Sequence, residues 1–331
     1  MPKGATIKEQ AEQLDRVVEA VRARPGSAPP DAGAKMAQFA RIASDLRGLP
    51  SELFKARLKV DLERRTTMAT PARPEKPIPT AFRTLTPYLT VQEAPKLLEF
   101  LQQAFGAEVL FQSTGSAGGI HSEVRIGDSK VMVGGGGTYE GPWFPTSIHL
   151  KVDDVDEVYG RALRLGATSI HEPTDFGYGE RGAGIQDVSG NRWYLATPRG
   201  ETHFLPEMGS VTPYLHPVGA GKLIDFLKDA FGAEEAARHE EPAGTVVHAK
   251  VRIGDSIVEM GEAHGAYQPM STMFYMDVAD VDSSYNRALR AGGKSIVAPA
   301  DQPYGARTAG VEDPFGNNWY LATPIKGVEK R

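Results

Sequence analysis

The 331-residue sequence has no cysteine, no long run of apolar residues and no excess of basic residues. Disulfides, thiolate metal sites and cysteine nucleophiles are therefore all excluded. No segment is apolar over enough length to span a bilayer, and the start of the chain lacks the apolar centre of a signal peptide. The formal net charge of −5 gives no reason to expect nucleic acid as a partner. We expect a cytoplasmic protein that binds neither membrane nor nucleic acid.

The sequence does contain one long pattern of residues that occurs twice. The stretch 301–324 repeats the stretch 175–198 at an offset of 126 residues (301 − 175). The same offset relates the TPYL motifs at 86–89 and 212–215, while HSEVRIGD at 121–128 matches HAKVRIGD at 248–255 with one extra residue. A repeat of this length predicts two copies of one fold, here called copy one and copy two, with any ligand pocket formed twice.

The first 80 residues lie outside the repeat. Residues 1–68 show the apolar spacing of three short amphipathic helices. Residues 69–80 contain four prolines and are typical of a semi-rigid linker. Three such helices cannot build much of a core alone. We expect this N-terminal helical segment to pack on the rest of the chain or on a twin subunit in a homodimer, or else to dock another protein.

Each copy resembles a domain of the vicinal oxygen chelate (VOC) superfamily, which includes glyoxalase I, bleomycin-resistance proteins and extradiol dioxygenases; the closest likeness is to its PhnB-like branch. The resemblance is carried by the TPYL opening, the HxxVRIGDS hairpin, residues 152–156, the tyrosine–arginine loop and the WYLATP ending. It implies an α+β fold of tandem VOC domains, each made of two βαβββ units that form a cupped mixed sheet. We expect domain 1 over residues 81–200 and domain 2 over residues 208–326. Which half-units pair to form each cup stays open.

Strand alternation predicts which side chains line the cups. In the first hairpin, Val124 should lie opposite Val131 and Glu123 opposite Met132, so the apolar set packs under the helices. The remaining side chains then face the cups, where the resemblance places ligands. The candidate ligand-binding residues are Tyr88, His121, Arg125, His149, Tyr178, Arg181, Tyr194, Tyr214, His248, Lys250, Arg252, Glu259, Tyr275, Tyr304, Arg307 and Tyr320.

The resemblance also raises the question of a metal. Metal-dependent members carry His, Glu or Gln on four strands, and the matching positions here are Thr86, Met132, Ser147 and Tyr194 in copy one and Thr212, Glu259, Met273 and Tyr320 in copy two. A divalent ion needs three or four N/O ligands, and Glu259 is the only credible one. We therefore expect no cofactor. The alternative is an off-register site of His149, His248 and Glu259, which forms only if half-units swap between copies and which would hold Zn, Ni, Mn or Fe.

Several candidate residues allow two interpretations. Glu259 lies opposite Lys250 in the hairpin, so it either forms a cross-strand ion pair or acts as a functional carboxylate. Because an ion pair at an exposed edge contributes only about 0–1 kcal/mol, we expect Glu259→Ala to leave metal content and thermal stability nearly unchanged. His121 and His248 either pack in hydrogen-bonded positions or bind a ligand. Arg181 and Arg307 either order their loops or bind an anionic or carbonyl-bearing ligand through the planar guanidinium.

Three functions remain open at this point. The first is metal-free binding of a small aromatic or amphiphilic molecule, as in bleomycin-resistance proteins, because tyrosine and methionine dominate the lining. The second is a VOC enzyme of the lyase, isomerase or dioxygenase type, with His248 and Glu259 as catalytic candidates. The third is a scaffold that acts through the N-terminal helices. We further expect the cup containing Glu259 and His248 to be functional and the other, with Met132 and Ser147, to be mainly structural.

Overall fold

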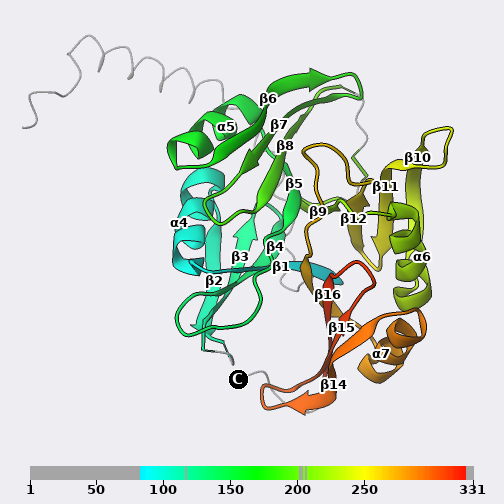
Figure 1. Cartoon of the computed structure of the whole chain (residues 1–331). Helices are drawn as coiled ribbons and strands as arrows, with labels where there is room; N and C mark the ends of the chain where they lie inside the picture. Colours follow the sequence, from blue (N-terminus) through cyan, green and yellow to red (C-terminus); the bar gives the residue numbers. More distant parts are fainter. Residues whose placement is uncertain (1–82, 116–117, 201–203, 206, 326–331) are drawn as a thin grey trace, which may run out of the picture. The chain divides into compact units, whose positions relative to one another are not determined.

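The computed structural model describes residues 83–115, 118–200, 204–205 and 207–325 as two eight-stranded mixed sheets (Figure 1). The expected helical segment 1–68 and the linker 69–80 lie outside the described residues. In spatial order, sheet 1 contains β14 (Lys294–Gln302), β15 (Ala306–Glu312), β16 (Asn318–Pro324), β13 (Met273–Asp277), β1 (Leu85–Val91), β4 (Ser129–Gly135), β3 (Ile120–Ile126) and β2 (Glu108–Thr114). Sheet 2 contains β10 (Glu234–Glu240), β11 (Val246–Ile253), β12 (Ser256–Met260), β9 (Val211–Leu215), β5 (Ser147–Lys151), β8 (Arg192–Pro198), β7 (Glu180–Gln186) and β6 (Thr168–Phe176).

Each sheet takes one half from each copy. In sheet 1, β1 of copy one pairs antiparallel with β13 of copy two, with Leu85 opposite Met276. In sheet 2, β5 of copy one pairs antiparallel with β9 of copy two, with Ile148 opposite Pro213. The half-units have therefore swapped between the copies. The α+β fold of paired βαβββ units is confirmed, and the question of which halves share a sheet is answered.

Four helices cover the sheets, and local sequence signals define their ends. Helices α4 (Ala94–Phe105) and α6 (Ala220–Phe231) end at Gly106 and Gly232, both in the left-handed conformation that glycine adopts without strain. Helices α5 (Val155–Arg164) and α7 (Val281–Arg290) begin after Asp154 and Asp280, whose carboxylates accept hydrogen bonds from backbone N–H groups in the first turn. None of the helices that the structure describes is long and apolar enough to cross a membrane.

The hydrophobic cores, unlike the sheets, follow the copies. Helices α4 and α5 enclose one core with Trp193, and α6 and α7 enclose the other with Trp319; both rings are fully buried. Within each copy an arginine of the second helix donates to a carbonyl of the first, Arg161 to Ala104 and Arg287 to Ala230. Figure 1 shows α4 beside α5 on one side and α6 beside α7 on the other. Each copy thus has its own core, while both sheets cross from one copy to the other.

The repeated hairpin turns join the copies. The carboxylate of Asp128 accepts from the backbone N–H of Ser210 at 2.6 Å, ahead of β9. At the equivalent place, Asp255 accepts from Thr84 at 2.7 Å, ahead of β1. Ser129 and Ser256, which follow the two aspartates, accept from the next backbone N–H groups along those strands. The repeated IGDS motif therefore fixes the start of the first strand of the opposite copy.

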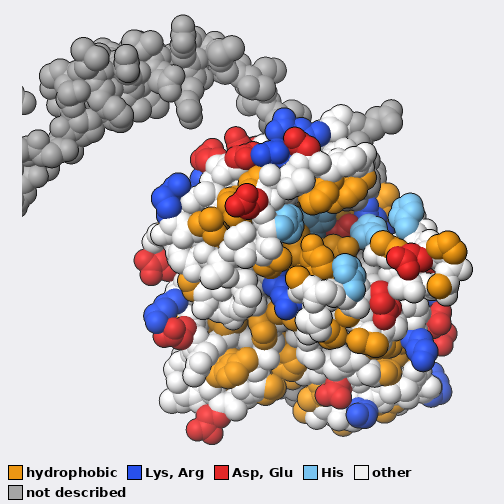
Figure 2. All heavy atoms as spheres, turned by 45° about the horizontal axis from the view of Figure 1, so that its top comes forward, with side chains coloured by type: hydrophobic (Ala, Val, Ile, Leu, Met, Phe, Trp, Pro, Cys, Tyr) orange, Lys and Arg blue, Asp and Glu red, His pale blue; other side chains and the backbone are white. Residues whose placement is uncertain are grey.

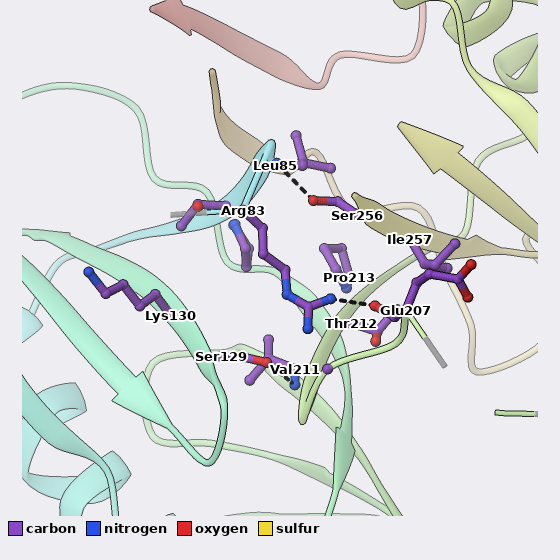
Figure 3. Close-up of a pocket in the computed structure, with 13 residues that line it drawn as sticks. Arg83, Leu85, Ser129, Lys130, Glu207, Val211, Thr212, Pro213, Ser256 and Ile257 are labelled. Carbon is purple, nitrogen blue, oxygen red and sulfur yellow. Dashed lines mark hydrogen bonds between the residues drawn. The ribbon is translucent and has the colours of Figure 1, made fainter. Parts of the chain in front are cut away.

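A small cavity lies along this seam between the copies (Figure 3). Its wall comes from the first strands and hairpins of both copies, including Thr86, Thr212, Ser129 and Ser256. The guanidinium of Arg83 donates to the backbone carbonyl of Glu207 across it. Because the polar side chains that point into it serve mainly to hold the two copies together, we interpret the cavity as a feature of the seam.

The predicted strand faces are confirmed. Val124 lies opposite Val131 and Glu123 opposite Met132, in the register that alternation requires. The apolar side chains that alternate along the central strands belong to the two cores: Ile148, Leu150, Trp193, Leu195, Phe274, Met276, Trp319 and Leu321. The helix-free faces are called cup 1, on sheet 1, and cup 2, on sheet 2. Ser147 thus lies in cup 2 with Glu259, which corrects its expected place beside Met132.

Candidate functional site

Glu259 is the centre of cup 2. Strand β12 places its side chain on the helix-free face, where it is 0% exposed. Its Oε2 accepts from His149 Nδ1 at 2.6 Å, and its Oε1 lies 3.2 Å from His248 Nε2. His149 comes from β5 of copy one and His248 from β11 of copy two. The swap of half-units therefore unites the three residues that the sequence could combine only as an alternative.

His149 lies between two carboxylates. Its Nδ1 faces Glu259, and its Nε2 lies 3.6 Å from Glu180 Oε2, at the start of β7. Burial alone would lower the pKa of His149, but the charges and hydrogen bonds of Glu259 and Glu180 outweigh it and raise the pKa to about 10. At neutral pH the imidazole is therefore a buried cation, held by two buried acids.

The same cluster explains the charge of Glu259. Burial opposes its ionisation, yet His149 and His248 lower its pKa well below the ordinary range of a glutamic acid. Lys250 is also buried, with Nζ 3.9 Å from Glu259 Oε1. Burial lowers the pKa of Lys250, and the two glutamates oppose that shift. Two buried acids thus face two buried bases, and the cluster compensates its own charge.

The expected exposed ion pair between Glu259 and Lys250 is wrong in one respect. The two side chains do face each other across the hairpin, but both are at most 2% exposed. The shortest contact of Glu259 is with His149, from the opposite copy. The small energies typical of exposed pairs do not apply, because removing one member of a buried pair leaves a buried charge without compensation.

An aromatic stack lies next to the cluster. The ring of His216 stacks on Tyr214 at 4.6 Å and on Tyr267 at 5.2 Å between ring centroids. Tyr194 meets all three rings at 5.5–5.8 Å, and Tyr214 also contacts the ring of His248. Figure 2 shows histidine side chains gathered around a hollow whose border is otherwise largely hydrophobic. Flat apolar faces beside a few fixed polar groups are typical of small-molecule sites.

Residues between the copies close one end of cup 2. Phe204 lies over His149, with ring centroids 5.3 Å apart, and Lys151 Nζ lies 5.7 Å from the centre of the same ring. Three residues further along the chain, the carboxylate of Glu207 accepts a hydrogen bond from the guanidinium of Arg252 at 3.0 Å. The connection between the copies therefore forms part of the wall of cup 2.

Cup 1 has a different character. Tyr88 OH lies 2.8 Å from His121 Nδ1, and burial, with smaller contributions from Tyr139 and Tyr320, raises the pKa of Tyr88 to about 12. The nearest counterpart of the buried ion cluster is Lys130–Glu123, at 3.7 Å and partly exposed. Where cup 2 has the buried ions, cup 1 carries the phenol rings of Tyr88, Tyr275 and Tyr320 and the thioethers of Met132 and Met273.

The predicted loop residues separate into two groups. Arg181 donates to both oxygens of Asp156 on α5, and Arg307 pairs in the same way with Asp282 on α7. Both arginines point towards the helices and away from the cups, so the loop-ordering interpretation describes them. Tyr178 and Tyr304 are 55% and 56% exposed. Arg125 contacts Glu108 at the side of cup 1.

A metal at the superfamily's usual positions does not fit these residues. Cup 1 offers Thr86, Met132, Met273 and Tyr320, and cup 2 offers Thr212, Glu259, Ser147 and Tyr194. The single carboxylate in this set already bonds to two histidines, and hydroxyl and thioether groups are poor ligands for hard or borderline divalent ions. In the described part of the chain, no three His, Asp or Glu side chains are arranged to hold a metal.

Sequence reasoning missed four residues of cup 2: Glu180, Arg192, His216 and Tyr267. Glu180 begins the strand after the tyrosine–arginine loop, directly before the candidate residue Arg181. For three of them the usable signal was a difference between the copies. The residues 126 positions away from Glu180, Arg192 and His216 are Ala306, Asn318 and Thr90.

Comparisons with known proteins agree with this fold. An uncharacterised protein of Mycobacterium tuberculosis is 32% identical over 141 residues, which is 39% of this chain and 83% of that protein. An uncharacterised protein of Mycobacterium bovis is 33% identical over 130 residues, covering 36% and 86%. Glyoxalase I from Zea mays shares the fold, with a TM-score of 0.58 at 17% identity over 72% of this chain and 92% of that enzyme.

The sequence model of one superfamily matches residues 83–195 and 220–321, which together are most of the described chain. Membership of the PhnB-like branch stays a prediction. The chain belongs to the Glyoxalase/Bleomycin resistance protein/Dioxygenase superfamily, the family that its repeated motifs resemble.

Proposed function

We propose that this protein binds a small aromatic or amphiphilic molecule in cup 2 and needs no metal to do so. The observation that carries the proposal is the buried cluster of Glu259, His149 and His248 beside the stacked rings of Tyr214 and His216. The charged side chains of the cluster form one edge of the site and orient a ligand, and the aromatic rings provide a surface on which it can stack. Cup 1 has rings but lacks such a cluster among the described residues.

The charge balance of the cluster supports binding without a metal. In metal-dependent proteins a divalent ion compensates buried acids. Here the cations of His149 and Lys250 compensate Glu259 and Glu180, at distances of 2.6–3.9 Å. An added divalent ion would have to displace these bases from the two carboxylates.

Two measurements on protein purified without chelator test this proposal. Native mass spectrometry should find a co-purified organic molecule, or show binding of an added one, and elemental analysis should find no stoichiometric Zn, Ni, Mn or Fe. One such metal per chain that is lost in Glu259→Gln would contradict the metal-free proposal.

One observation favours acid–base catalysis as a second candidate. Glu259 Oε1 lies 3.2 Å from His248 Nε2, and a carboxylate that orients an imidazole is a frequent arrangement around a general base. Binding and catalysis are separated by recovering the bound compound after incubation. A pure binding protein returns it unchanged, whereas an enzyme returns a product that His248→Gln no longer forms. The scaffold hypothesis concerns residues 1–68, and deletion of residues 1–80 would test it.

A further inference from the structure

Arg192 is a cation in cup 2 that has no acidic partner in the described part of the chain. It begins β8, opposite Ser147, on the same face as Tyr194. Its guanidinium donates to the backbone carbonyl of Gln268 at 3.0 Å and forms no ion pair with a carboxylate of the described residues. The equivalent residue of cup 1 is Asn318. Among the arginines near the cups, Arg252 and Arg125 pair with glutamates.

A buried imidazole beside Arg192 also has an unused polar atom. His216 is 6% exposed, and its Nδ1 has no hydrogen-bond partner among the described residues. Burial, with the nearby charges of Arg192 and His264, lowers the pKa of His216 to about 4, so the ring is neutral at physiological pH. A buried polar atom without a partner destabilises the folded protein, and a ligand atom that bonds to His216 Nδ1 would remove this cost.

The surrounding rings define what can accompany a charged group at this place. Tyr267 stacks on His216 from the loop between β12 and β13, and Tyr194 approaches His216 edge-on and Tyr267 at a tilt. The same loop places Gln268 against Arg192 and Met270 against Ser147. A planar ring on the ligand would therefore meet aromatic side chains directly next to the cation.

We propose that the ligand of cup 2 is an aromatic acid, whose single negative charge is held by Arg192 and hydrogen-bonded by His216. This inference rests on the proposed function of cup 2 and names the class of molecule bound there. One uncompensated guanidinium matches one negative charge, and its planar fork fits a carboxylate. A dianionic phosphate would bring a second charge for which cup 2 offers no further unpaired arginine in the described residues.

Matched pairs of acid and amide test the inference directly. Binding of benzoate and benzamide, and of 1-naphthoate and 1-naphthamide, is measured by calorimetry on the full chain. The acid of a pair should bind about 10- to 100-fold more tightly than its amide, the range typical of a hydrogen bond to a charged group. Arg192→Gln should reduce the affinity for the acid to that for the amide and leave the amide unaffected. Arg290→Gln, on an exposed position of α7, changes the net charge equally and should have no effect.

The outcomes separate the two proposals. Equal affinities for acid and amide in the unmodified protein would overturn the anion site but leave aromatic binding in cup 2 intact. Absence of binding in both series would overturn the proposed function itself. An equal loss in Arg290→Gln and Arg192→Gln would replace the site with a general effect of net charge and so contradict it. Because the acid–amide preference is measured first in the unmodified protein, the test does not depend on whether a variant folds.

Discussion

Cup 1 and cup 2 are built from equivalent strands, yet five ionisable residues of cup 2 are replaced by neutral side chains at the equivalent positions of cup 1. The five pairs of equivalent residues, with the residue of cup 2 named first, are Glu259 and Met132, His149 and Tyr275, Glu180 and Ala306, Arg192 and Asn318, and His216 and Thr90. The turns, helix caps and core residues are alike in both copies, whereas the buried ionisable side chains of the cups lie in cup 2. The residues that the two copies share therefore maintain the fold, and the residues that differ between the cups serve the function.

The swap of half-units makes this difference more informative. Glu259, His248 and His216 come from the first half of copy two, while His149 and Arg192 come from the second half of copy one. Substitutions that are far apart in the sequence and lie in different copies thus meet in a single cup. Such coordination is expected of a binding site and is not required for packing.

The largest difference between the cups should appear on removing their acids. Glu259→Ala would leave the His149 cation buried without its main partner, and losses of this kind are about 3–5 kcal/mol in the free energy of unfolding. Glu123→Ala, in the partly exposed pair of cup 1, should cost about 0–1 kcal/mol. Urea denaturation of both variants measures the contrast. Similar small losses would mean that the cluster of cup 2 is solvated and not buried.

A second difference should appear in the pH dependence of stability. The pKa of His149 is raised from 6.5 to about 10 in the folded protein. Its contribution is therefore complete below pH 6.5 and is lost as the pH rises towards 10. Unfolding free energies measured from neutral to alkaline pH should decline more steeply for the unmodified protein than for His149→Gln. Burial lowers the pKa of Lys250, so Lys250 changes the stability in the opposite direction as the pH rises. Because both proteins contain Lys250, the difference between their two stability curves reflects the charge of His149. Parallel curves would show that His149 is neutral.

The closed end of cup 2 should have a smaller effect. Phe204→Ala removes a half-buried ring from His149 and Lys151, and a loss of about 1–2 kcal/mol is expected, below the range for fully buried phenylalanines. Tyr304→Ala, 56% exposed at cup 1, should change stability by about 0.5 kcal/mol or less. Thermal unfolding of the two variants is the comparison. Equal shifts would indicate that Phe204 does not form a wall of cup 2.

The smallest effect is expected where the copies agree. Arg181→Ala and Arg307→Ala each remove a partly exposed arginine that bonds to a more exposed helix aspartate. Both variants should show the same slight decrease in the urea midpoint, because exposed ion pairs contribute little. Neither should alter the affinity of cup 2 for an aromatic probe. Weaker binding in Arg181→Ala alone would restore the anion-recognition role suggested by the sequence.

Much of the fold could be read from the sequence because its signals are local. Alternation fixed the faces of β3, β4, β5 and β8, and the ends of α4 and α5 lie at residues that favour such ends locally, Gly106 and Asp154. The edge strands β2 and β6 were not placed, because most of their residues are exposed and each contains a bulge that breaks the alternation.

The candidate site was less predictable because it depends on pairings across the two copies. His149 and His248 could be named, but their distance from Glu259 follows from the contact of β5 with β9, which no local pattern specifies. For the same reason Glu259 was expected at an exposed edge. Arg192 and His216 can be recognised as site residues only once the loop that carries Tyr267 packs against them.

Calorimetric titration with 1-naphthoate tests most directly whether cup 2 is the binding cup. We predict one site per chain, lost in His248→Ala and retained in His121→Ala, because His248 contacts the buried cluster and His121 bonds to Tyr88 in cup 1. Two equal sites per chain, or loss of binding only in His121→Ala, would contradict it.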